Sequence, residues 1–371
     1  MAEERTPPAR RRLAILALAA LLVGLGIAMS QLIRRGTLAA FTRPEAGTRL
    51  FVHEFALFGT YARLSFWTTA DVDGLAADKI AADLQKLHDT INIFDPHSEI
   101  SRLNQSAAAA PFPCSLKLWY LLRECRRAYQ ETGGVFDISV GPLMRLWGLH
   151  QARQSLPTAA EIEDTLQAVG LNKVVFDDVN RTVRFTHPKT CLDFGGIAKG
   201  YALDRAVRIA RTCGVRSGLI DLGGNLFCFE VPPPGKHAYA VGIRDPFGPD
   251  DILGTVPLKD CAVSTSGNYE RQIVIEKQTI GHIMDPRTGY PVEGVAGVTL
   301  ICKTAVETEG MSKTLFVLGI KQAEPILAGL PDCHALFVPD EQPIRIVITR
   351  GFARFFTPDP AFADKVTVIG K

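Results

Sequence analysis

Residues 193–204 read DFGGIAKGYALD, where an apolar run ends in paired glycines and passes directly into a predicted helix. Gly195 and Gly196 lack the Cβ atoms that would keep a ligand away from the backbone, and the first amides of a helix attract anions. Lys199 falls in the first turn of this helix, where its ammonium would lie near those amides. The stretch therefore predicts a phosphate-binding turn.

Two further residues of this stretch have expected roles. Asp193 could accept hydrogen bonds from a base or a ribose, and Gly200 would let the helix pack closely on the segment that precedes it. A tight turn between a strand and a helix, with no ligand, is the alternative for any single pair of glycines.

Three other polar turns that contain glycine also follow apolar runs. They are LIDLGGN at residues 219–225, VSTSGNYER at residues 263–271 and GHIMDPRTGYP at residues 281–291. The repetition favours a ligand site that is built from several turns.

Together these stretches resemble the ApbE family, the FAD:protein FMN transferases, which move an FMN moiety from FAD to a threonine or serine of a target protein. The resemblance covers roughly residues 50 to 356. Other matching pieces follow in the family's order: Gly59-Thr60, SEISRLN at 98–104, GGVFDISVGP at 133–142 with Leu146-Trp147-Gly148 after it, and SKTLFVLG at 312–319.

The predicted helices and strands are mixed without a regular βαβ alternation, which favours an α+β fold over a doubly wound parallel sheet. With the resemblance, we expect a single two-lobed ApbE-like domain over residues 49–371, with mixed, largely antiparallel sheets. The hydrophobic patterns predict strands near 51–69, 174–176, 183–185, 219–222, 238–243, 261–264, 272–275, 298–302 and 344–349, and helices near 75–91, 118–129, 159–169, 308–318 and 321–329.

The N-terminal region contains a candidate membrane segment. Residues 13–33 carry no charge over 21 positions, which is long enough for a helix to cross a bilayer, and arginines flank both ends. We expect an uncleaved anchor, with residues 1–12 in the cytoplasm, residues 34–48 as a linker and the catalytic domain on the periplasmic side of the inner membrane. A cleaved signal sequence is the alternative.

Composition excludes some classes of partner and site. The chain has 41 basic and 39 acidic residues, so it lacks the strong positive charge that nucleic-acid binding requires. None of its eight cysteines forms the C-x-x-C spacing of a zinc or redox site. Cys228, Cys261 and Cys302 fit buried thiols within strands as well as bonded cysteines, so the sequence assigns no disulfide.

His282 is the candidate catalytic base, because it lies in the polar turn HIMDPRTG and histidine titrates near neutral pH. The resemblance is to a stretch in which a histidine deprotonates the acceptor hydroxyl. Asp285, three residues later, could orient His282 or cap the turn. A structural histidine is the alternative.

The resemblance places the flavin against Phe94, against the turn Val135-Phe136-Asp137, and against Asp193, Lys199 and Met284. The two phenylalanines offer aromatic faces, the two aspartates accept hydrogen bonds and the lysine meets the pyrophosphate. Ordinary core packing is the alternative for both phenylalanines. Relatives commonly carry tyrosine at the position of Phe94.

The resemblance also implies Mg²⁺, which relatives hold with an aspartate, a threonine four residues later and a backbone carbonyl. The matching positions here are Glu309, Lys313 and the carbonyl of Gly196. Glutamate can bind a hard cation, but a protonated lysine cannot be a ligand. An alignment shifted by one residue would use Thr314 instead. We therefore expect weak magnesium binding.

The expected activity is transfer of FMN from FAD to a threonine or serine hydroxyl of a target protein, with release of AMP. An FAD pyrophosphatase that uses water as the acceptor, and an FAD-binding protein that has lost transfer, are the alternatives. The expected partner is an acceptor flavoprotein, an exported or membrane redox protein.

Overall fold

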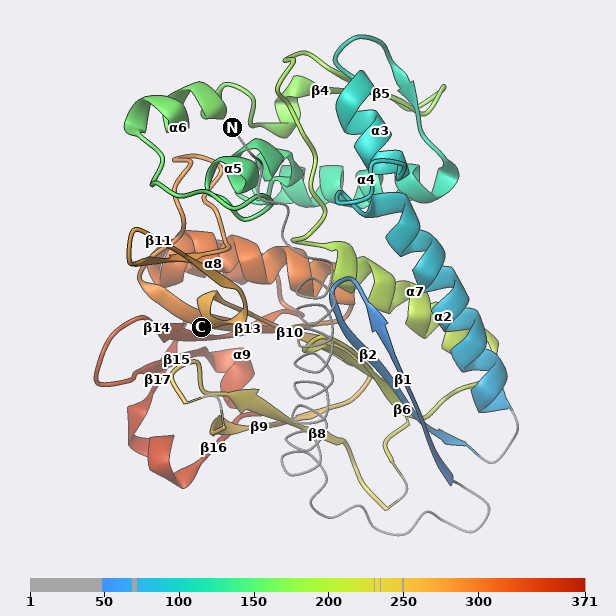
Figure 1. Cartoon of the computed structure of the whole chain (residues 1–371). Helices are drawn as coiled ribbons and strands as arrows, with labels where there is room; N and C mark the ends of the chain where they lie inside the picture. The colour runs from blue at the N-terminus through green and yellow to red at the C-terminus, as the bar shows by residue number, and fades with distance from the viewer. Residues whose placement is uncertain (1–48, 69–71, 230, 234, 249, 371) are drawn as a thin grey trace, which may run out of the picture. The chain divides into compact units, whose positions relative to one another are not determined.

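The computed structural model describes residues 49–68, 72–229, 231–233, 235–248 and 250–370. These residues belong to one compact unit, Pro44–Lys371 (Figure 1). The expected anchor at 13–33 and the whole of the expected linker at 34–48 lie outside the described residues. Among the helices that are described, none combines the length and the apolar character that a membrane span needs.

The helices and 3₁₀ turns follow the chain in this order: α2 (Val72–Ile91), α3 (Glu99–Ser106), α4 (Leu116–Glu131), η1 (Ile138–Val140), α5 (Gly141–Leu146), α6 (Ala159–Leu166), η2 (Leu171–Lys173), α7 (Ala198–Thr212), η3 (Asn268–Glu270), α8 (Ala305–Ala328), α9 (Arg350–Ala353) and η4 (Pro360–Lys365).

The strands form one large sheet and three small ones. The nine-stranded sheet has the order β1-β2-β6-β7-β10-β13-β14-β15-β17, and the small sheets are β16-β9-β8, β3-β5-β4 and β11-β12. Their bounds are β1 (Arg49–Leu57), β2 (Thr60–Thr68), β3 (Phe112–Pro113), β4 (Val174–Asp177), β5 (Thr182–Phe185), β6 (Gly218–Leu222), β7 (Asn225–Cys228), β8 (Tyr239–Arg244), β9 (Ile252–Leu258), β10 (Cys261–Gly267), β11 (Gln272–Ile275), β12 (Gln278–Gly281), β13 (Val295–Cys302), β14 (His334–Pro339), β15 (Ile346–Thr349), β16 (Thr357–Pro358) and β17 (Val366–Ile369).

Alternating side chains of the large sheet point to its two opposite faces, and each face packs against other elements. On β2, Leu64 and Phe66 pack with α2 and α7, whereas Trp67 packs with Tyr239 of β8 on the opposite face. On β14, Phe337 packs against α8. The sheet thus has helices on one face and the small sheet β16-β9-β8 on the other, because successive side chains of a strand point to opposite faces.

The predicted α+β class and the mixed, largely antiparallel pairing are confirmed. In the nine-stranded sheet every described pairing is antiparallel except that of β15 with β17. The two helices expected at 308–318 and 321–329 are the two parts of α8, which Gly319 interrupts with φ 65° and ψ 175°. The apolar run before the double-glycine turn is not part of any sheet that the structure describes, so this turn does not join a strand to a helix.

Helices α7 and α8 cap each other. The Asp204 carboxylate of α7 accepts the amides of Ala305 and Val306 at 2.8 and 2.9 Å, and Glu309 Oε2 of α8 accepts the amide of Gly200 at 2.7 Å. Each carboxylate therefore satisfies amides at the start of the other helix, where the helix dipole also favours a negative charge.

The reciprocal caps need Gly200. A Cβ at this position would lie 2.3 Å from the carbonyl oxygen of Ala305, which is fixed backbone. The expected close packing at Gly200 is therefore confirmed, although the neighbour is α8, which follows in the sequence, and not the segment that precedes the helix.

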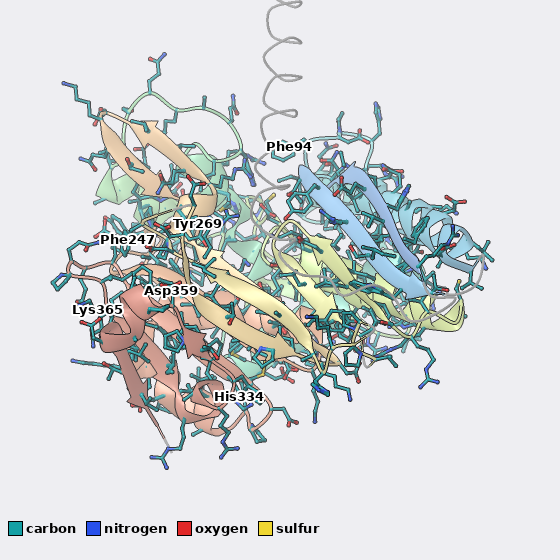
Figure 2. The ribbon with its side chains drawn as sticks, turned by 90° about the horizontal axis from the view of Figure 1, so that it is seen from below. Phe94, Phe247, Tyr269, His334, Asp359 and Lys365 are labelled. Carbon is teal, nitrogen blue, oxygen red and sulfur yellow. A yellow bond between two sulfur atoms is a disulfide. The ribbon has the colours of Figure 1, made fainter. Side chains whose placement is uncertain are left out.

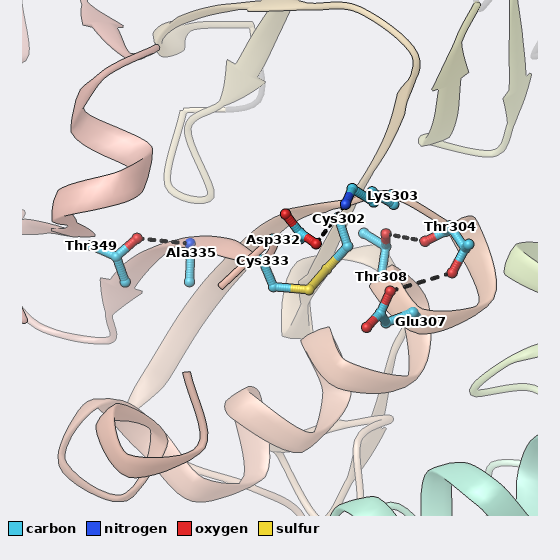
Figure 3. The surroundings of a disulfide bond; sticks show 9 residues. All are labelled: Cys302, Lys303, Thr304, Glu307, Thr308, Asp332, Cys333, Ala335 and Thr349. Carbon is cyan, nitrogen blue, oxygen red and sulfur yellow. Dashed lines mark hydrogen bonds and ion pairs between the residues drawn. A yellow bond between two sulfur atoms is a disulfide. The ribbon is translucent and has the colours of Figure 1, made fainter. Parts of the chain in front are cut away.

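A disulfide joins Cys302, the last residue of β13, to Cys333, which directly precedes β14 (Figure 3). The sequence had left Cys302 open between a buried thiol and a bonded cysteine. The other six cysteines are free. An ion pair between Lys303 and Asp332 at 2.6 Å lies beside the disulfide.

Replacing Gly200 with alanine should lower the free energy of unfolding by at least about 2 kcal/mol, because the new methyl group must push two helices apart. Gly74→Ala is the matched control: Gly74 lies in the first turn of α2, its Cβ would meet nothing within 4 Å, and this change should be neutral or stabilise by up to about 1 kcal/mol. Urea unfolding followed by tryptophan fluorescence measures both. Equal stability of the two variants would contradict the tight contact.

Candidate active site

Asp193 binds the first amide of the double-glycine turn and a nearby histidine. Its Oδ1 accepts the amide of Gly195 at 2.6 Å, and its Oδ2 lies 2.7 Å from Nε2 of His150. Burial alone would raise the pKa of Asp193, but the hydrogen bond and charge of His150 and the Gly195 amide together lower it below the ordinary value. Asp193 is thus held as a carboxylate at the start of the turn.

His150 connects Asp193 to an exposed aromatic ring. Phe94 meets the His150 ring edge-on, with 5.8 Å between the ring centroids, and 63% of Phe94 is exposed. Figure 2 shows Phe94 at the surface. Sequence reasoning missed His150, although it lies only two residues after the Leu146-Trp147-Gly148 motif. The structure thus brings Phe94 and Asp193 together through a residue that was not predicted.

Lys199 connects two double-glycine turns. It lies in the first turn of α7, as predicted, and its Nζ donates to the carbonyl oxygen of Gly223 at 3.4 Å. Burial raises the pKa of Asp221, next to this second turn, and the charge of Lys199 offsets part of that rise. The ammonium therefore lies close to both turns, where it can contact an anion bound there.

The turn itself is closely packed. A Cβ on Gly196 would lie 3.3 Å from Cδ of Lys313 and 3.5 Å from Cε2 of Phe136. Phe136 belongs to the largest core cluster, and the edge of its ring packs against the turn at Gly196. The predicted residues Phe136, Gly196 and Lys199 therefore lie in one place.

His282 is held as a neutral imidazole. Its Nδ1 lies 3.1 Å from the carbonyl oxygen of Arg271, and since a carbonyl only accepts, Nδ1 carries the proton and Nε2 keeps a lone pair. Burial and the positive charges of Lys313, Arg271 and Lys199 lower the pKa of His282 to about 4, although the Arg271 carbonyl opposes them. A histidine that is neutral at pH 7 can accept a proton, as a general base must.

Asp285 caps its own turn and does not orient His282. Both of its carboxylate oxygens bind the Arg287 guanidinium, at 2.9 and 2.7 Å, and Oδ1 also accepts the Arg287 amide. Its backbone closes the turn through Tyr290 and Gly289. Of the two roles considered for Asp285, the structure supports the cap. The carbonyl of Arg271 is the group that orients His282.

Three other residues predicted to contact the flavin cap a turn or pack within the protein. The carboxylate of Asp137 accepts the amides of Ser139 and Leu171 at 2.7 and 3.0 Å, so it caps η1, and burial raises its pKa. Met284 is buried in the cluster around α5 and α6. Val135 is half-buried in the turn after α4. Direct contacts of these residues with a flavin remain predictions.

Glu309 and Lys313 are the residues offered for a metal. Glu309 is fully buried, and its Oε1 accepts no hydrogen bond within the described chain. The Nζ of Lys313 lies 3.6 Å from that oxygen and 3.4 Å from Oγ of Ser266. Thr314, the alternative ligand, is buried and donates to the carbonyl of Gly310.

This donor set does not fit a divalent ion. The set offers one carboxylate oxygen of Glu309 and the carbonyl of Gly196, but the Lys313 ammonium lies 3.6 Å from that carboxylate oxygen and would repel a divalent ion bound to it. The one group of three potential metal-binding side chains in the described part of the chain is Cys302, Glu307 and Cys333, and its two sulfurs are bonded to each other.

Comparison with known proteins identifies the family. Residues 58–337 match the ApbE family model. The chain belongs to the ApbE family. Its members of similar sequence include the FAD:protein FMN transferases of Klebsiella pneumoniae (strain 342), 27% identical over 80% of this chain and 91% of that protein, and of Treponema pallidum (strain Nichols), 28% identical over 80% and 88%.

Solved ApbE structures share the fold. The ApbE protein of Thermotoga maritima superimposes with a TM-score of 0.77 at 30% identity, covering 83% of this chain and all of that one. The flavin transferase ApbE of Vibrio cholerae gives a TM-score of 0.73 at 23% identity over 83% and 99% of the two chains. The ApbE fold therefore extends over nearly the whole described unit.

The protonation of His282 can be measured directly. In a protein with ¹⁵N-labelled histidine, the His282 ring should titrate near pH 4, well below an ordinary histidine, because burial and three cations disfavour its charged form. His282→Ala identifies the signal by its disappearance. Titration of that signal near pH 6.5 would mean that the ring is solvated and far from those cations.

Proposed function

We propose that this ApbE protein transfers the FMN moiety of FAD to a threonine or serine hydroxyl of another protein and releases AMP. The observation that carries the proposal is the neutral His282 ring, with Nε2 available, among Lys313, Arg271 and Lys199. A base surrounded by cations suits attack of a hydroxyl on a dianionic pyrophosphate. Family membership supports FAD as the substrate.

The reaction makes one phosphorus–oxygen bond and breaks one. The acceptor oxygen attacks the phosphorus on the FMN side of the pyrophosphate while its proton passes to Nε2 of His282. The bond from that phosphorus to the bridging oxygen breaks, and its electron pair leaves with AMP. The product is a phosphoester of FMN with the acceptor side chain, and His282 then returns its proton to solvent.

The cations and the aromatic edge give the substrate its orientation. Lys199, between the two double-glycine turns, and Lys313 provide positive charge for the pyrophosphate. Phe94 offers an exposed ring for stacking with a flavin or adenine, and its edge-to-face contact with His150, which Asp193 binds, helps to hold that ring in place. Binding the reactants in one orientation supplies part of the rate enhancement.

The magnesium ion implied by the resemblance is not used in this proposal. The carboxylate of Glu309 is shared between the start of α7 and the Lys313 ammonium, and that arrangement does not fit a divalent ion. The proposed chemistry uses the side chains of this chain alone.

We also propose that the protein works at the outer face of the cytoplasmic membrane. The uncharged segment 13–33 would anchor it, and the acceptor would be an exported or membrane redox protein. The Cys302–Cys333 disulfide supports this location, because disulfides persist in oxidising compartments and are rare in the cytosol.

Transfer is tested with FAD and an acceptor flavoprotein domain, by intact-mass spectrometry. We expect the acceptor to gain the mass of FMN less water, and no gain after its acceptor threonine is changed to alanine. His282→Ala should slow transfer by roughly a hundredfold or more, the usual contribution of a general base, while FAD binding persists. His237→Ala, an exposed histidine in a loop, is the matched control.

The same assay separates the alternatives. Free FMN and AMP without modified acceptor would indicate a pyrophosphatase, and unchanged bound FAD would indicate a binding protein without transfer. Undiminished transfer by His282→Ala would remove this histidine from the mechanism.

Protease treatment of intact spheroplasts tests the location. If the domain faces outward, external protease should degrade it while a cytoplasmic marker survives, because the bilayer protects only the inner side. Full protection in spheroplasts, with degradation after lysis, would place the domain in the cytoplasm and refute the proposed topology.

A further inference from the structure

The Glu309 carboxylate is buried, and only one of its two oxygens accepts a hydrogen bond from the described residues. Its Oε2 caps α7 through the amide of Gly200, and its Oε1 has no hydrogen-bond donor among the described residues, although no part of the side chain is exposed. A buried carboxylate is strongly destabilised unless a positive charge lies close to it. Such a charge is therefore required near Oε1.

Lys313 provides this charge from the next turn of α8. Its Nζ lies 3.6 Å from Glu309 Oε1 and 3.4 Å from Ser266 Oγ, and 18% of its side chain is exposed. Its aliphatic part lies against Gly196 in the double-glycine turn. The ammonium is thus close to the carboxylate, to the turn proposed to bind pyrophosphate and, through its charge, to His282.

We propose that the Lys313 ammonium is the resident cation of this active site and replaces a divalent metal ion, so that FMN transfer by this protein does not need magnesium. The inference rests on the proposed function. In the resting protein Lys313 pairs with Glu309. When FAD binds, the flexible side chain turns its three N–H donors toward the pyrophosphate, and the negative charge that develops on the departing AMP is stabilised by Lys313.

Charge and space both exclude a second cation. An Mg²⁺ bound to Oε1 would lie about 2.1 Å from it and so within a few ångströms of Nζ, where two like charges repel strongly in a site shielded from water. Lysine is a point charge on a flexible arm and forms single hydrogen bonds to phosphate oxygens, whereas a metal ion bridges two of them. Replacing the metal ion with Lys313 should therefore slow FMN transfer but make it independent of metal.

The first measurement uses Mn²⁺ as an EPR probe on the unmodified, metal-stripped protein. We expect the signal of free Mn²⁺ to persist at millimolar concentration, because Lys313 occupies the position of the ion. In Lys313→Thr, which replaces the ammonium with a neutral oxygen donor, binding should strengthen at least tenfold. Lys321→Thr, the same change at an exposed position of α8, should behave like the unmodified protein.

The second measurement is FMN transfer in EDTA. The unmodified protein and Lys321→Thr should keep their rates within about twofold, since no metal is removed from them. Lys313→Thr should lose transfer at least tenfold in EDTA and regain it with Mg²⁺, because it lacks a cation until the ion binds. If Lys313→Thr does not fold, as judged by circular dichroism, Lys313→Arg should retain transfer in EDTA through its preserved charge.

The outcome that overturns the proposal is visible in the unmodified protein: tight Mn²⁺ binding, with transfer lost in EDTA and restored by Mg²⁺. Failure of the proposed function is distinct, since no transfer would then occur with or without metal. In that case the EPR comparison still decides the role of Lys313. Exclusion of Mn²⁺ only while Lys313 is present supports it as the resident cation, and equal binding by both proteins refutes it.

Discussion

The close contact of α7 with α8 is the constraint on which the active site depends. Each helix caps the other through a buried carboxylate, Asp204 in one direction and Glu309 in the other, and only glycine fits at position 200. Because the first turn of α7 carries Lys199 and the first turns of α8 carry Glu309 and Lys313, this contact places three charged groups beside one backbone turn. The packing of the fold and the electrostatics of the site therefore have one origin.

The candidate site combines a neutral histidine with several neighbouring cations. His282 remains uncharged because burial and neighbouring positive charges oppose its protonation, and the same charges suit a pyrophosphate. A histidine with a lowered pKa is a weak base, so the proposed reaction relies also on holding the acceptor hydroxyl against phosphorus.

Local sequence predicted much of the fold and part of the site. The double-glycine turn and the helix that carries Lys199 follow from short-range backbone preferences, which a single sequence displays. His150 and Arg271 were missed because their roles arise from tertiary contacts, one with Asp193 and one, through its carbonyl, with His282. Neither contact leaves a local pattern in the chain.

Carboxylates illustrate the same limit. The residue type of Asp285 allowed either an orienting role or a cap, and only the bidentate contact with Arg287 distinguishes the two. Asp137 accepts two backbone amides, one of them from a residue 34 positions away, so its partners could not be found from neighbouring residues. The sequence suggested Glu309 as a metal ligand, and the structure shows that its carboxylate also caps α7, which lies much earlier in the chain.

The disulfide between Cys302 and Cys333 closes a covalent ring that contains the whole of α8, and with it Glu309 and Lys313. A single cut of the backbone inside this ring leaves both fragments attached to the same molecule. The ends on either side of the cut stay tethered near their native positions, so the helix can re-form in place. At the periplasmic location proposed above, this ring would keep both fragments of a protease-nicked α8 in one molecule.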